Sequence, residues 1–176
     1  MCSWGFATCG RELRDAIKDA LAEGVLVFAS ASNAGLNEGK PTYPSRKVGV
    51  YSIGACDRFG HAADFTSPNA RYLFPGKDIT STYPRYLAGA SPNATKCLSG
   101  CSMATAVASG LAARILGYAE VCGLDRLELR KDERMEDIFK SLFRRDSEKY
   151  IFPWDRIPQG TQSPVEWLRF RFFPDI

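Results

Sequence analysis

Ser102 and Asn33 are the residues with the clearest potential for chemistry. Ser102 lies in the run 98–106, where small residues precede an alanine-rich helix. The N-terminus of a helix presents unpaired N–H groups and a partial positive charge, and both can stabilise a developing oxyanion. Asn33 lies in a loop of small residues, 30–35, directly after the apolar run 25–29. A serine in such a position is suited to nucleophilic acyl transfer, and an asparagine just past a strand end could lie near it.

Each of these two residues also has an ordinary structural explanation. A serine at a helix start is more often an N-cap, and an asparagine among small residues is more often a turn former. The surrounding elements decide between the two explanations. Where the chain forms a parallel α/β sheet, loops that follow the strands gather at one edge, and ligand sites lie there.

The hydrophobic pattern predicts such a sheet. Residues 11–23 place Leu13, Ile17 and Leu21 on one helical face, and the runs 25–29 and 47–54 are typical of buried parallel strands. Turn formers and short apolar pieces over 55–97 indicate edge strands and loops. Residues 102–119 are expected to form a second, largely buried helix. This α/β order brings Asn33 and Ser102 to the same edge.

Composition limits the function further. The 176 residues are 45% hydrophobic and carry a net charge of +3, which favours one ordinary domain and gives no reason to expect nucleic acid or a membrane surface as partner. No apolar stretch approaches the roughly 18 residues that cross a bilayer. No signal peptide pattern is present, which favours the cytoplasm and mostly reduced thiols for the six cysteines. The cysteines form no CxxC pair and stand far from the single histidine, so a zinc site is not expected.

The character of the chain changes after about residue 122, which divides it into 1–122 and 123–176. Residues 124–149 are densely charged, and their apolar positions predict an amphipathic helix whose buried face holds Leu127, Met135, Ile138, Phe139 and Leu142. Residues 150–176 contain prolines among aromatics and are expected to be an irregular surface tail.

Several motifs, in order and spacing, resemble the subtilisin-like serine peptidases. The resemblance covers about residues 1–118 and implies a three-layer α/β fold with a parallel sheet, of which this chain would be the C-terminal half. The segments that carry it are Ser3-Trp4-Gly5, Ala29-Ser30-Ala31-Ser32-Asn33-Ala34-Gly35, Tyr43-Pro44 with the strand after it, Asp64-Phe65-Thr66-Ser67, Leu73-Phe74-Pro75-Gly76 and Ser102-Met103-Ala104-Thr105.

The resemblance implies a role for each of these positions. Ser102 would be the nucleophile, and its own N–H with the side chain of Asn33 would form the oxyanion hole. The cleft for an extended polypeptide substrate would be lined by Ser3, Trp4, Gly5, Ala31 and Ser32. No cofactor is implied.

Nucleophilic attack by Ser102 also requires a general base, for which the sequence offers no clear candidate. His61 is the only histidine, but the resemblance places it on a surface turn. Asp57, Asp64 and Asp78 are interpreted as carboxylates in turns or at the surface. The family's catalytic histidine and aspartate belong upstream of Ser3. They would therefore come from an N-terminal half or a partner chain.

Departures from the family pattern leave alternatives open. Cys101 stands where the family has threonine, and Ser32 stands where it has a glycine that lines the pocket for the residue before the scissile bond. Specificity therefore cannot be transferred. The leading hypothesis is a serine endopeptidase. The others are a peptide-binding module without catalysis and a truncated fragment with no role of its own.

Overall fold

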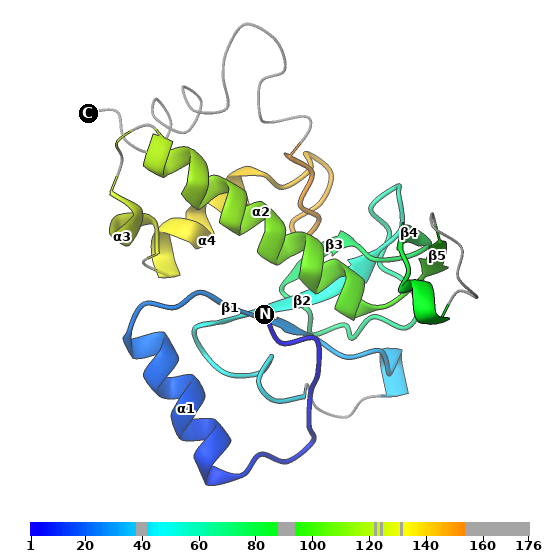
Figure 1. Cartoon of the computed structure of the whole chain (residues 1–176), viewed down its shortest axis with the longest axis horizontal. Coiled ribbons are helices and arrows are strands. Elements are labelled where there is room, and N and C mark those ends of the chain that lie inside the picture. Colours follow the sequence, from blue (N-terminus) through cyan, green and yellow to red (C-terminus); the bar gives the residue numbers. More distant parts are fainter. Residues whose placement is uncertain (38–41, 88–93, 122, 124, 131, 154–176) are drawn as a thin grey trace, which may run out of the picture.

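A computed structural model describes residues 1–37, 42–87, 94–121, 123, 125–130 and 132–153 (Figure 1). Within these ranges, the helices and strands in chain order are α1 Arg11–Ala22, β1 Val27–Ser30, the 3-10 turn Gly35–Asn37, β2 Val50–Cys56, β3 Tyr72–Pro75, β4 Ile79–Thr82, the 3-10 turn Arg85–Leu87, β5 Thr95–Leu98, α2 Cys101–Val121, α3 Arg126–Leu129 and α4 Asp132–Ser141. None of the helices in these ranges has the length and apolar character needed to cross a membrane.

A parallel sheet in the order β1-β2-β3 forms the centre. Val27 lies beside Val50 in the β1–β2 register, and Ile53 lies beside Tyr72 in the β2–β3 register. The two predicted strands and their parallel pairing are confirmed. The predicted second strand began too early, because residues 47–49 form a turn in which Val48 is exposed. β3 is a buried parallel strand in a region expected to hold edge strands.

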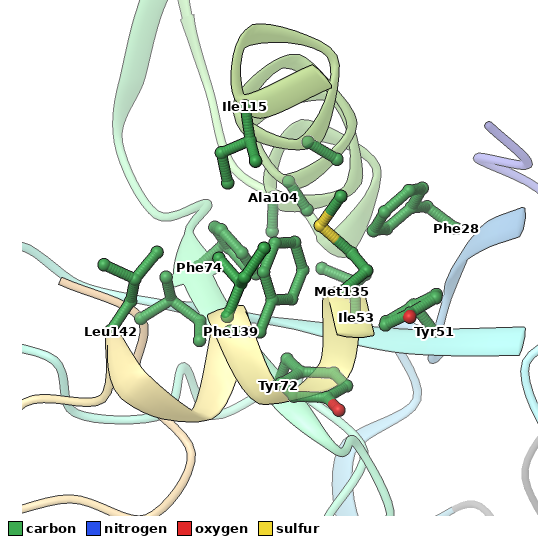
Figure 2. Close-up of a cluster of buried hydrophobic side chains, with 14 of the residues drawn as sticks. Phe28, Tyr51, Ile53, Tyr72, Phe74, Ala104, Ile115, Met135, Phe139 and Leu142 are labelled. Atoms are coloured by element: carbon green, nitrogen blue, oxygen red, sulfur yellow. The ribbon is translucent and has the colours of Figure 1, made fainter. Parts of the chain in front are cut away.

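Alternate strand residues divide the molecule into three layers. One face of the sheet carries a large aromatic and aliphatic core against α2 and α4, shown in Figure 2: Phe28, Tyr51, Ile53, Tyr72 and Phe74. The other face packs Val27, Ala29 and Val50 against Ile17 of α1. Helices therefore cover both faces of the sheet, as the resemblance implies.

α2 is buried on one side only. Its inner side packs small residues, including Ala104, Ala108 and Ala112, against the sheet. Its outer side is exposed, and Val121 near its end is 81% exposed. A side chain added at Gly110 would meet nothing within 4 Å. The expected largely buried helix is therefore buried along one side only, and its exposed side combines apolar residues with Arg114 and Glu120.

α4 completes the core beside α2. Four of the five positions expected to face inward are fully buried: Met135, Ile138, Phe139 and Leu142. Leu127, the fifth, is 66% exposed and lies in the separate short helix α3, so this part of the prediction is wrong. The division at residue 122 stays a prediction, but α4 shares one core cluster with α2 and the sheet.

Short segments extend the sheet beyond β1 and β3. At β1, the N–H of Cys2 donates to the Phe28 carbonyl at 2.7 Å, and the N–H of Ser30 donates to the Cys2 carbonyl at 3.0 Å. At β3, the N–H of Ile151 donates to the Leu73 carbonyl at 3.0 Å. The beginning of the region expected to be an irregular tail is therefore paired with the sheet, and 154–176 lie outside the described residues. β4 and β5 form a separate antiparallel pair.

Candidate active site

Ser102 lies in the first turn of α2, which is held close against the sheet. The N–H of Gly100 donates to the Gly76 carbonyl at 2.8 Å. A Cβ at Gly76 would lie 2.7 Å from the Ala55 Cβ and 2.9 Å from the Ala104 Cβ. Because real Cβ atoms do not approach so closely, only glycine at position 76 allows the start of α2 to come this near to β2.

Asn33 follows β1 and reaches the same helix start. Its Oδ1 accepts a hydrogen bond of 2.8 Å from the N–H of Cys101. This bond fixes the amide plane and turns Nδ2 away from Cys101. The sequence prediction that Asn33 and Ser102 meet is thereby confirmed.

Two N–H donors border the same space at this point. A carbon at the Cβ position of Gly100 would lie 3.4 Å from Nδ2 of Asn33 and 3.8 Å from the backbone N of Ser102. Within the described ranges, neither nitrogen donates a hydrogen bond to the protein. The absence of a side chain at Gly100 leaves this space open, and N–H donors that border one space are what the stabilisation of an oxyanion requires.

The loop that carries Asn33 is strained and tied down. Ser32 has a φ of 111°, a left-handed conformation that costs a non-glycine residue about 1–3 kcal/mol. Its carbonyl accepts a hydrogen bond of 3.0 Å from the thiol of the fully buried Cys101. Its hydroxyl accepts one of 3.1 Å from the N–H of Ala34. Cys101 therefore holds both ends of the Ser32–Asn33 pair, a role that the sequence did not indicate.

The expected peptide-binding segment lies beside Ser102. The Ser102 hydroxyl donates to the Ser3 carbonyl at 3.0 Å. Trp4 and Gly5 are exposed, and their backbone groups have no partner within the described part of the chain. Such an edge can pair with an extended peptide. Of the other two expected cleft residues, Ser32 is partly buried, whereas the side chain of Ala31 is fully buried.

His61 lies on a turn, as expected. Its Nδ1 is 3.5 Å from Oδ2 of Asp57, and the backbone N–H groups of His61 and Phe59 donate to Oδ1 of that aspartate. Partial burial raises the pKa of the Asp57 carboxyl, but these hydrogen bonds outweigh it, so the pKa lies below its usual value. In the described ranges, no contact joins His61 to Ser102. Asp64 and Asp78 are exposed, as expected.

The cysteines offer no second centre. The five within the described ranges are free thiols, and no group of three or more metal-ligating side chains lies together there. Burial raises the pKa of the Cys56 thiol to about 12, which makes a thiolate nucleophile unavailable at that position.

A parallel α/β sheet with a serine in the first turn of a helix and an amide beside it is an arrangement typical of serine hydrolases. The sequence model of the subtilase family matches residues 2–130. The chain therefore belongs to the subtilase family.

Individual relatives agree. The chain is 35% identical to subtilisin DY of Bacillus licheniformis over 108 residues, which cover 59% of this chain and 37% of that protein. It is 34% identical to M-protease of Shouchella clausii (strain KSM-K16) over 115 residues, 64% of this chain and 28% of that protein. Among solved structures, the S218A mutant of the PatA protease domain gives a TM-score of 0.67 at 25% identity, covering 85% of this chain and 55% of that one. The chain thus spans about a third of the two curated relatives.

Proposed function

We propose that this chain carries the nucleophile, the oxyanion hole and part of the peptide cleft of a serine endopeptidase. Oγ of Ser102 attacks the carbonyl carbon of a peptide bond, and the carbonyl oxygen becomes an oxyanion held by Nδ2 of Asn33 and the N–H of Ser102. The observation that carries the proposal is that these two nitrogens, neither of which donates to the described part of the protein, border the space left by Gly100. The name of the similar M-protease of Shouchella clausii (strain KSM-K16) agrees with this proposal.

The substrate would lie along residues 3–5 as an extended strand. Its backbone would pair with the open groups of Trp4 and Gly5, which brings its carbonyl to Ser102. Recognition through the backbone holds many sequences in one geometry, and positioning of this kind supplies much of the rate enhancement of enzymes.

The attack also releases the proton of the Ser102 hydroxyl, and a base must accept this proton. The Ser102 hydroxyl donates to the Ser3 carbonyl. A carbonyl of this kind orients the proton but is far too weak a base to remove it. Within the described ranges, no histidine or carboxylate contacts Ser102. We therefore place the base, a histidine with its orienting carboxylate, in polypeptide that these residues do not include.

The outer side of α2 is where that polypeptide would dock. This side is exposed, largely apolar apart from Arg114 and Glu120, and begins one turn from Ser102. The relatives contain long stretches with no counterpart in this chain, since it spans about a third of them. The occupant that we propose is the remainder of a subtilase domain, joined upstream or supplied by a partner chain.

A peptide-binding module without catalysis is the second candidate. The Ser102–Ser3 hydrogen bond favours it, because this bond leaves the nucleophile in a resting arrangement while the peptide edge stays open. A truncated fragment without a role of its own stays a third hypothesis, and aggregation of the isolated chain through α2 would support it.

Labelling with a fluorophosphonate, which reacts only with an activated serine, separates the candidates. The protein is isolated from its own cells, treated with the probe, and the Ser102 peptide is examined by mass spectrometry. We expect labelling that is lost in Ser102→Ala and slowed about 10²–10³-fold in Asn33→Ala, a magnitude measured on a subtilisin. His61→Ala is the matched control and should label normally. Unlabelled Ser102 would favour the binding module, and dependence on His61 would refute the proposed source of the base.

A further inference from the structure

We infer that Cys101 is a positioning residue of the proposed oxyanion site: its thiol holds the strained Ser32 peptide in place and so fixes the amide of Asn33. The inference rests on the proposed function and names a further residue that serves it. The side chain of Cys101 is fully buried, and its Sγ donates to the Ser32 carbonyl at 3.0 Å. The backbone N–H of the same residue donates to Oδ1 of Asn33 at 2.8 Å. One residue of α2 therefore contacts two consecutive residues of the loop after β1.

These contacts matter because the middle of the loop has few others. The ends of the loop are fixed to neighbouring elements at Ala31 and Gly35, whose N–H groups donate to backbone carbonyls at 2.8 and 2.9 Å. Between these ends, the hydrogen bonds that join residues 32–34 to another element of the described chain are the two from Cys101. The other hydrogen bonds of residues 32–34 lie within the loop itself and would move with it.

Ser32 needs this restraint because its backbone is strained. Its φ of 111° costs a non-glycine residue about 1–3 kcal/mol, and such a conformation persists only where the surroundings hold it. The thiol acts on the carbonyl of the peptide bond that joins Ser32 to Asn33. Without this hydrogen bond, Ser32 can relax towards an ordinary φ, which would turn that peptide and carry the Asn33 side chain away from Cys101. Nδ2 of Asn33, 3.4 Å from the Cβ position of Gly100, would then leave the oxyanion space.

The thiol is itself confined, so it can act as a fixed point for the loop. Its Sγ lies 3.7 Å from Oγ1 of Thr66. That hydroxyl donates to the Ala55 carbonyl at 2.7 Å and accepts from the Ala55 N–H at 3.0 Å, which fixes Thr66 on β2. Because the one hydroxyl hydrogen of Thr66 is directed at Ala55, the thiol keeps its own hydrogen for Ser32. The strand β2, the helix α2 and the loop after β1 thus meet at one buried sulfur atom.

This arrangement predicts that positions 32 and 101 are energetically coupled. Glycine adopts a φ of 111° without strain, so a loop with Ser32→Gly needs the thiol less. Loss of the thiol should therefore disturb Asn33 strongly when residue 32 is serine and weakly when it is glycine. A double-mutant cycle over the two positions measures this coupling.

Amide hydrogen exchange of the full chain, followed by NMR, tests the inference without requiring catalysis. The N–H of residue 101 reports on the bond to Asn33, and the N–H of Ala104, which donates to the Gly100 carbonyl at 3.4 Å, reports on the start of α2. We expect Cys101→Ala to lower the protection of the residue 101 amide about tenfold and to shift the side-chain NH2 signals of Asn33, with Ala104 unchanged. Cys101→Ser keeps a donor and is the matched control, which should retain the protection. In the Ser32→Gly background, Cys101→Ala should lower the protection less than about threefold.

The exchange data can overturn the inference in three ways. These are an unchanged residue 101 amide in Cys101→Ala, an equal loss of protection at Ala104, which would mean fraying of the helix, and the same loss with serine and with glycine at position 32. If the alanine variant does not fold, Cys101→Val, which also lacks a donor but fills the space, is the second variant, with the same expected result.

Fluorophosphonate labelling separates this inference from the proposed function. If Cys101 acts through Asn33, adding Cys101→Ala to Asn33→Ala should not slow the labelling of Ser102 any further. An additional loss would overturn the positioning role and leave the serine endopeptidase standing. Absence of labelling in the unchanged protein would overturn the proposed function, and the exchange data would still decide whether Cys101 fixes Asn33.

Discussion

Replacing Phe139 by alanine should remove a large part of the stability of the fold that holds the site. Phe139 lies in α4, beyond the residues matched by the family, and its side chain is fully buried. Its ring centroid lies 5.6–5.9 Å from four aromatic rings that come from all three strands: Phe28, Tyr51, Tyr72 and Phe74. This one side chain therefore joins α4 to the whole width of the sheet.

The magnitude follows from this packing. Truncation of a buried phenylalanine to alanine costs about 3–5 kcal/mol, and the cost is greatest where the surroundings cannot close on the cavity. The neighbours here are strand residues whose backbones are fixed by the sheet, so we expect about 4 kcal/mol. Domains are stable by about 5–15 kcal/mol in total. For a chain of this length the expected fall in Tm is about 8–16 °C.

Urea unfolding followed by circular dichroism measures the effect. With a slope of about 2 kcal/mol per molar, the midpoint should fall by about 2 M. Leu127→Ala is the matched control, because the same amphipathic pattern predicted it to be buried, whereas it is 66% exposed; its loss should stay below about 0.5 kcal/mol. Phe139→Leu, which leaves a smaller cavity, keeps the test readable if the alanine variant does not fold. A loss below about 1.5 kcal/mol for Phe139→Ala would refute the docking of α4 on the sheet.

Three further changes test single features. Ser32→Gly should raise the stability by about 1 kcal/mol in urea unfolding, because glycine adopts a φ of 111° without strain; a loss would contradict the strained loop. Burial raises the pKa of Glu136, but the hydrogen bonds and positive charges of Lys140 and Arg71 together outweigh it, so its pKa lies below the usual value. The stabilisation is then present above the unfolded pKa and lost as the pH falls through the folded one, so Glu136→Gln should cost up to about 1 kcal/mol at pH 7 and progressively less as the pH is lowered through the folded pKa. Iodoacetamide at pH 8 should label the exposed Cys97 and spare Cys56, whose thiol pKa burial raises to about 12, as read by peptide mass mapping; early labelling of Cys56 would contradict its burial.

The elements predicted correctly from the sequence are those whose signal is local. The run 25–29 is apolar throughout, and Ile17 stands at the centre of a helical stripe, so β1 and α1 could be recognised from their own residues. β3 could not, because it has four residues and ends at Pro75. Its identity as a strand comes from parallel pairing with β2, which is a contact between distant parts of the chain.

Two errors of burial have separate physical causes. The pattern that placed Leu127 inward assumed one continuous helix, whereas α3 ends at Leu129 and α4 begins at Asp132, so the helical register is broken between them. The outer side of α2 was predicted to be buried because the helix has a largely apolar sequence, and such a sequence indicates only that the helix suits apolar surroundings. The sequence of the helix does not indicate whether the polypeptide that covers it belongs to the same chain.

Some features of the candidate site could also be predicted from the sequence, and others could not. The proximity of Asn33 and Ser102 follows from the parallel sheet, whereas the parts that set their geometry, Gly76, Gly100 and the Cys101 hydrogen bonds, became visible only in three dimensions. All of these groups are backbone or short side chains fixed within residues 1–105. In the proposed site, oxyanion stabilisation is therefore preorganised within these residues, whereas proton removal depends on a base from elsewhere. Loss of the whole triad costs about 10⁶ in turnover in a subtilisin, so the chain by itself should bind peptide and stabilise an oxyanion without appreciable turnover until a base is docked beside Ser102.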